Sequence, residues 1–132
     1  MDHNKYFNLL YKVAEAVQPV GKTRLAACLV QRNALVAIGT NKMKTHPFQQ
    51  QFAKNECAIY LHAEIDCIVN ALRHMNQDEL CKCTMHVLRV KHGDHGLIQG
   101  MAKPCSGCQR ALAQFNIKNV YYTLNENGYD YL

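Results

Sequence analysis

Two short stretches of this 132-residue chain carry residue types that could perform hydrolytic chemistry. The first is His62-Ala63-Glu64, and the second is Pro104-Cys105-Ser106-Gly107-Cys108. One imidazole and two thiolates are good ligands for zinc, and three protein ligands leave the fourth tetrahedral position open for water. The set His62, Cys105 and Cys108 therefore predicts a catalytic zinc site rather than a closed structural one.

Glu64 is the candidate for moving protons at this site. It follows His62 at a spacing of two residues, close enough to contact a zinc-bound water without being a ligand itself. Zinc lowers the pKa of a bound water towards about 7, which produces a nucleophile at neutral pH. We expect Glu64 to take the proton of that water and to pass it to the substrate.

Other interpretations of the motifs remain open. Cys105-x-x-Cys108 also fits a zinc knuckle or a redox pair, and His62-x-Glu64 alone is compatible with a surface pair on a helix. A structural zinc normally takes four protein ligands, and Cys81-x-Cys83 is the remaining close cysteine pair. The combination favours catalysis, and a zinc-stabilised, non-catalytic binding module is the alternative. A second zinc would draw its ligands from a scattered set: Cys28, Cys57, Cys81, Cys83, His92 and His95.

Apolar periodicity places both motifs where helices begin. Residues 65–72 carry apolar side chains at i, i+3, i+4 and i+7, which predicts a helix that opens at the His62 motif. Residues 108–115 repeat this spacing and predict a second helix that opens at Cys105. A metal in front of two helix ends can be reached by side chains from each, and the first-turn N–H groups favour thiolate over thiol.

The rest of the pattern predicts an α/β fold. Residues 3–18 have the apolar stripe of an amphipathic helix. The order strand, helix, strand in the C-terminal part implies a right-handed parallel crossover. We interpret 39–60 as a functional loop, and the Gly-rich stretch 91–103 as another loop. The predicted strands cover 25–30, 34–38, 84–90 and 120–123, and the first two form a hairpin through Gln31-Arg32-Asn33.

Composition limits the class of protein. A hydrophobic content of 48% in 132 residues predicts one domain over residues 1–132. No apolar run approaches about 18 residues, so we expect neither a membrane span nor secretion. Seven dispersed cysteines favour reduced thiols with a metal, and a cytoplasmic location. The net charge of +5 suits a phosphate-bearing substrate but falls short of a polybasic nucleic-acid arm.

The two motifs resemble the H-x-E and P-C-x-x-C signature of the cytidine and deoxycytidylate deaminase superfamily. The order of predicted elements is similar to that superfamily over nearly the whole chain. The resemblance implies a three-layer α-β-α sandwich with a mixed central sheet, Zn²⁺ as cofactor and Glu64 as proton shuttle. It also implies attack of hydroxide on C4 of cytosine or C6 of adenine, substrate contacts by Ala63 and Pro104, and a homo-oligomer.

The resemblance also suggests a substrate. His62-Ala63-Glu64-Ile65-Asp66 followed by Asn70-Ala71-Leu72 is similar to deoxycytidylate deaminases, including small phage versions. Asn41 resembles the asparagine that contacts the sugar or base in the superfamily, with a turn cap as the alternative. We therefore expect a free cytosine nucleotide or nucleoside, with dCMP converted to dUMP as the leading reaction. Expected phosphate contacts, if they are not merely a solvated basic loop, are Lys42, Lys44, His46 and Lys54.

A deaminase of single-stranded DNA or tRNA is the second enzymatic hypothesis. Such an enzyme needs an aromatic stacking platform and a basic groove. The chain has no Trp, and its aromatic cluster, Tyr121-Tyr122 with Tyr129 and Tyr131, is expected in strand core or subunit interface positions. Nucleic acid is therefore the less favoured partner.

Overall fold

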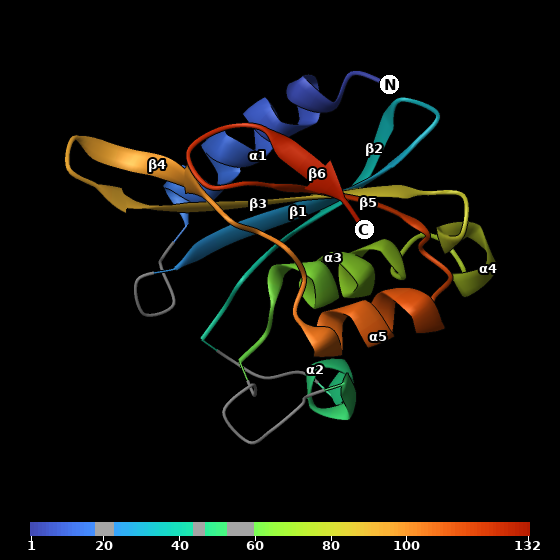
Figure 1. Cartoon of the computed structure of the whole chain (residues 1–132). Helices are drawn as coiled ribbons and strands as arrows, with labels where there is room; N and C mark the ends of the chain where they lie inside the picture. Colours follow the sequence, from blue (N-terminus) through green and yellow to red (C-terminus); the bar gives the residue numbers. More distant parts are fainter. Residues whose placement is uncertain (18–22, 44–46, 53–59) are drawn as a thin grey trace.

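The computed structural model describes residues 1–17, 23–43, 47–52 and 60–132. Its helices are α1 (His3–Ala16), α2 (Pro47–Phe52), α3 (Ala63–Ala71), α4 (Gln77–Leu80) and α5 (Ser106–Gln114). Its strands are β1 (Arg24–Gln31), β2 (Ala34–Thr40), β3 (Thr84–Gly93), β4 (Gly96–Gly100), β5 (Asn119–Thr123) and β6 (Tyr129–Tyr131). One six-stranded sheet has α1 on one face and α3, α4 and α5 on the other (Figure 1). The predicted three-layer α-β-α sandwich is confirmed.

The sheet is mixed, with strand order β2-β1-β3-β5-β6 and with β4 paired to β3. Strands β3 and β5 run parallel, whereas the other named strand pairs of the described residues are antiparallel. The β1–β2 hairpin turns at Arg32 and Asn33, whose φ angles of 53° and 61° suit a two-residue hairpin turn. The predicted hairpin and the predicted parallel pairing are both confirmed.

The stretch 91–103, predicted as a loop, is for the most part a strand pair. Strand β3 continues to Gly93, and β4 returns along it until Gly100 lies opposite Arg89. The hydroxyl of Tyr11 donates a hydrogen bond to the carbonyl oxygen of Leu97 at 3.1 Å, so α1 supports the added strand. The loop prediction is wrong because β4 has little apolar periodicity of its own and is stabilised by its pairing with β3.

Several short elements lie outside the predicted pattern. Helix α2 falls within the stretch 39–60 that we expected to be a loop, and α4 and β6 had no predicted counterpart. Each is six residues or fewer, too short for periodicity to identify it. Among the described helices, none combines the length and the apolar character that crossing a bilayer requires.

The sheet separates two hydrophobic cores, and β3 contributes residues to both. Met85 and Val87 belong to the cluster on the side of α3 and α5, whereas Leu88 and Val90 belong to the cluster on the side of α1. Successive side chains of a strand point to opposite faces, so one continuous apolar run serves both clusters. Helices α3 and α5 pack together on the face of the sheet that carries Met85 and Val87.

A close backbone contact fixes α3 on β2. A Cβ atom at Gly39 would lie 2.2 Å from the backbone nitrogen of Cys67 and 2.4 Å from the carbonyl oxygen of Ala63. Two hydrogen bonds extend the same contact, from Asn70 Nδ2 to the carbonyl oxygen of Ile38 at 2.8 Å and from the Thr40 backbone to Asp66 Oδ2 at 3.0 Å. The contact needs a residue without a side chain at position 39.

We predict that Gly39→Ala lowers the free energy of unfolding by about 3 kcal/mol, because the new methyl group meets immobile helix backbone. Chemical denaturation would measure the change. Gly100→Ala is the matched control: the atoms nearest to its Cβ belong to side chains, of Arg89 at 3.3 Å and of Lys91 at 3.5 Å, which can shift more easily than helix backbone. We expect that control to change the stability by less than about 1 kcal/mol. Equal stabilities of the two variants would contradict the proposed contact.

Candidate active site

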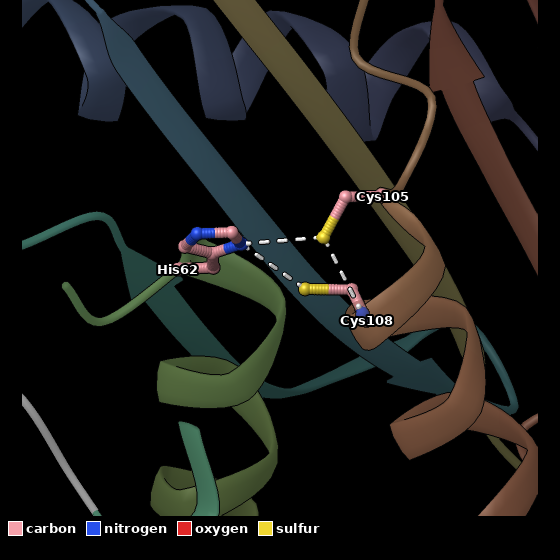
Figure 2. Close-up of side chains that lie close together, drawn as sticks. All are labelled: His62, Cys105 and Cys108. Carbon is pink, nitrogen blue, oxygen red and sulfur yellow. Dashed lines mark hydrogen bonds between the residues drawn. The ribbon is translucent and has the colours of Figure 1, made fainter. Parts of the chain in front are cut away.

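The structure brings His62, Cys105 and Cys108 together although they lie far apart in the sequence. Nδ1 of His62 is 3.3 Å from Sγ of Cys108 and 3.7 Å from Sγ of Cys105. Figure 2 shows the imidazole and the two sulfurs pointing at one another from the ends of α3 and α5. All three ligand atoms lie within 4.8 Å of one another, so the group could hold one metal ion.

These distances fit zinc coordination. Zn–N bonds of about 2.0 Å and Zn–S bonds of about 2.3 Å at a tetrahedral angle place nitrogen and sulfur about 3.5 Å apart. The two observed separations, 3.3 and 3.7 Å, lie on either side of that value. Nδ1 is the nitrogen that faces both sulfurs, and it is therefore the ring atom that would bind the metal.

Both motifs occupy helix starts, as the sequence predicts. His62 is the N-cap residue of α3, and its backbone N–H donates to Oε1 of Gln49 at 3.0 Å. Cys105 is the N-cap residue of α5, and its sulfur accepts a hydrogen bond from the backbone N–H of Cys108 at 3.5 Å. The helix-end partial charge and these N–H groups favour negative charge on the Cys105 sulfur.

The two thiols of the cluster differ in pKa. The Cys108 thiol and the His62 ring donate hydrogen bonds to the Cys105 sulfur and lower the pKa of Cys105 to about 3. The hydrogen bond with Cys105 and burial both raise the pKa of Cys108. The hydrogen bond with Cys105 also raises the pKa of His62. The negative charge therefore rests on Cys105, and a cation that displaces the shared proton gains a second thiolate ligand.

Glu64 lies in the first turn of α3 and is only 3% exposed. Burial raises the pKa of its carboxyl group, because a low-dielectric environment disfavours the charged form. Glu64 nevertheless borders the same cavity as His62 and Cys105. A buried carboxyl group at the wall of a cavity can exchange protons with a molecule bound there.

The cavity beside the ligand cluster measures about 330 Å³. Small-molecule sites usually start near that size. Its described lining combines the two motifs with residues of β1, β3 and the segment after β4. The lining residues are Thr23, Leu25, Asn41, Tyr60, Leu61, His62, Ala63, Glu64, Arg89, Met101, Ala102, Lys103 and Cys105.

Some of the expected substrate contacts line the cavity and others do not. Ala63 and Asn41 line the cavity, whereas Pro104 is buried outside its described lining, with its carbonyl oxygen accepting from Gln109 Nε2 at 2.8 Å. His46 lies outside the described residues. So do Lys44 and Lys54, the other loop residues expected near a phosphate.

Asn41 links two strands at the edge of the cavity. Its Oδ1 accepts from the Leu25 backbone at 2.9 Å, and its Nδ2 donates to the carbonyl oxygen of Thr23 at 3.1 Å. A primary amide has a second N–H and a second lone pair available after these bonds. Asn41 therefore shapes the wall of the cavity, and its contact with substrate stays a prediction.

The ammonium group of Lys42 is bound by other side chains of the fold. Its ammonium group forms an ion pair with Asp66 and donates to Thr40 Oγ1 at 3.2 Å. Asp66 is buried and needs a cationic partner to offset its lost hydration. Lys42 does not belong to the described lining of the cavity, and its predicted phosphate contact stays a prediction.

Sequence reasoning missed several residues of the site. Gln49 holds the His62 backbone from α2, a helix too short to predict. Arg89 and Lys103 border the cavity from segments that carry no motif. The alternation of β3 was the available signal for Arg89, because it places residue 89 on the same face as 85 and 87.

Metal-binding groups are confined to one place in the described residues. The His62, Cys105 and Cys108 cluster is the group there with at least three suitably spaced ligands. Cys28 and Cys83 are buried free thiols, and Cys81 is an exposed one. Within those residues, the structure therefore adds no support for a second zinc.

Comparisons with solved structures agree with this fold. The dCMP deaminase of cyanophage S-TIM5 in apo form is 20% identical, with a TM-score of 0.58 over 92% of this chain and 82% of that chain. The same enzyme in complex with dCMP and dUMP is 18% identical, with a TM-score of 0.57 over 92% and 79%. Cytidine deaminase from Burkholderia pseudomallei is 15% identical, with a TM-score of 0.68 over 100% and 92%.

No curated protein sequence matches the chain significantly. The sequence model of the cytidine and deoxycytidylate deaminase zinc-binding region, in contrast, matches residues 1–124. This match covers both motifs and nearly all the elements described above. The chain belongs to the cytidine and deoxycytidylate deaminase family, and it is a zinc-dependent hydrolytic deaminase.

Proposed function

We propose that the chain deaminates a free cytosine nucleotide, with dCMP converted to dUMP as the leading reaction. The observation that carries this proposal is the position of Glu64 beside the His62, Cys105 and Cys108 cluster in the wall of one cavity. A volume of about 330 Å³ is within the range of small-molecule sites. A homologous fold in complex with dCMP and dUMP supports the same class of substrate.

His62, Cys105 and Cys108 would hold the zinc, His62 through Nδ1 and the cysteines through their sulfurs. Zinc, when bound, supplies the acidity that turns water into a nucleophile at neutral pH. With three protein ligands, the site keeps a position open for that water. Ala63 and Asn41 are the expected contacts that orient the base and sugar in the cavity.

Glu64 would carry the protons. Hydroxide adds to C4 of cytosine, and Glu64 transfers the water proton to N3 of the ring. The remaining hydroxyl proton then passes through Glu64 to the amine, the C4–N4 bond breaks, and ammonia leaves while a C4 carbonyl forms. The buried position of Glu64 beside the ligand cluster supports this role, because a shuttle must reach both water and base.

Polynucleotide substrates remain the second hypothesis, and the tyrosines give it little support. Tyr122 is a core residue, as expected, while Tyr129 and Tyr131 on β6 are exposed and lie outside the described lining of the cavity. Tyr60 borders the cavity and is 44% exposed. One exposed tyrosine ring in the described lining falls short of a stacking platform.

We predict one zinc per chain and its loss in Cys108→Ser, because the remaining two ligands bind zinc poorly. Elemental analysis of the purified proteins would measure the metal content. Cys81→Ser is the matched control, since Cys81 is exposed and is not a member of the cluster. Retention of a full zinc in Cys108→Ser would exclude the proposed ligand set.

We predict that Glu64→Gln keeps its zinc and loses turnover by at least about 100-fold, because the amide cannot accept the water proton. Product chromatography and metal analysis on the same preparation would test both statements. Turnover close to that of the unmodified chain would remove Glu64 from the mechanism. If Glu64→Gln keeps its zinc and the unmodified chain shows no turnover either, the result would instead favour the non-catalytic binding module.

The substrate is tested with dCMP, deoxycytidine, cytidine, single-stranded DNA and tRNA, assayed side by side for the deaminated product. We expect turnover of the free cytosine compounds, with dCMP preferred. Activity restricted to the two polymers would refute the proposed substrate class.

A further inference from the structure

Arg89 occupies an unusual position for a charged residue. It lies on β3 after Met85 and Val87, on the face that carries α3 and α5, and it borders the cavity beside the zinc ligands. Its cross-strand neighbours are Leu25 on β1 and Gly100 on β4. Because residues 85, 87 and 89 lie on the same face of the strand, the positively charged Arg89 lies in the cavity wall at the edge of the core.

The added strand β4 holds the stem of this side chain. A Cβ atom at Gly100 would lie 3.3 Å from both Cγ and Cδ of Arg89, closer than an ordinary contact. The stem thus lies directly over the backbone of position 100, in space that a larger residue would fill. This arrangement restricts the side chain before any ligand binds, which lowers the entropic cost of binding.

One donor of the Arg89 guanidinium group has no hydrogen-bond partner among the described residues. This donor, Nε, is buried and makes no hydrogen bond. The ion pair found among the described residues joins Lys42 to Asp66 and does not include Arg89. A buried, unpaired cationic donor is unfavourable unless something binds it. A planar group with several N–H donors matches a phosphate, which it can bind through two parallel hydrogen bonds.

The positive charges in the cavity lining favour an anionic ligand. Arg89 and Lys103 supply positive charge to the described lining, and Glu64, next to the zinc ligands, is the acidic residue in it. Low-dielectric walls strengthen the attraction of such a cationic surface for an anionic substrate. The cavity lining therefore combines the candidate catalytic residues His62 and Glu64 with the cationic residues Arg89 and Lys103.

We propose that Arg89 binds the phosphate of the substrate and makes this deaminase selective for nucleotides over nucleosides, with Lys103 adding positive charge to the lining of the same cavity. This inference rests on the proposed function, since it assigns a role within that active site. It makes Arg89 a specificity-determining residue, distinct from the residues that hold zinc or move protons.

The test compares Arg89→Gln with the unmodified chain on dCMP and on deoxycytidine. We expect kcat/KM for dCMP to fall by about 10- to 100-fold, chiefly through KM, because a hydrogen bond between charged groups is lost. The value for deoxycytidine, which has no phosphate, is expected to stay the same. Lys82→Gln is the matched control, since Lys82 is exposed in the turn before β3 and its loss changes the net charge equally.

A second variant tests the position of Arg89 without removing its charge. Gly100→Ala crowds the Arg89 stem and is expected to lower kcat/KM for dCMP several-fold, again with deoxycytidine unaffected. An equal loss on both substrates, or no loss on dCMP in Arg89→Gln, would overturn the proposal. Thermal unfolding of each variant identifies a loss that comes from misfolding, which lowers both activities together.

Failure of the proposed function gives a different result. If the unmodified chain deaminates neither dCMP nor deoxycytidine, the reaction assignment is wrong. The phosphate site is then tested directly by calorimetric titration of inorganic phosphate into the zinc-loaded unmodified chain and into Arg89→Gln. Weaker binding by the variant supports the site, and equal binding by both proteins rejects it.

Discussion

The backbone contact between α3 and β2 at Gly39 determines where the candidate catalytic residues lie. His62 caps α3 and Glu64 lies in its first turn, so both move with the helix. The contact is close enough that a Cβ atom at Gly39 would overlap the helix backbone. Asn70, which donates a hydrogen bond to β2, and Asp66, which accepts one from it, fix the helix along its length. Catalytic groups supported by such rigid contacts keep the short distances that proton transfer requires.

Strand β3 gives the site its second half. Its residues on one face pass from the core, at Met85 and Val87, to the cavity wall at Arg89. The parallel strand β5 lies next to it, and α5, which connects to β5, presents Cys105 and Cys108 to the same cavity region. The candidate zinc ligands and Arg89 are therefore positioned by one face of the sheet.

The basic residues of the chain differ in how much of their charge the fold already neutralises. Lys42 compensates the buried carboxylate of Asp66, which would otherwise be costly. Arg89 has no such partner among the described residues and borders the cavity. The two side chains are equivalent in a count of charges, but of these two it is Arg89 whose cationic group is left for an anionic ligand.

The sequence determined the chemistry of the site and most of the fold. Ligand types and spacing identify His62, Cys105, Cys108 and Glu64, and apolar periodicity places them at helix starts, because local patterns depend only on neighbouring residues. Tertiary structure decided β4, the engagement of Lys42 and the exposure of Arg89 to the cavity. Each depends on a partner distant in sequence, such as Gly100 for Arg89 or Asp66 for Lys42, and no local pattern records such a partner.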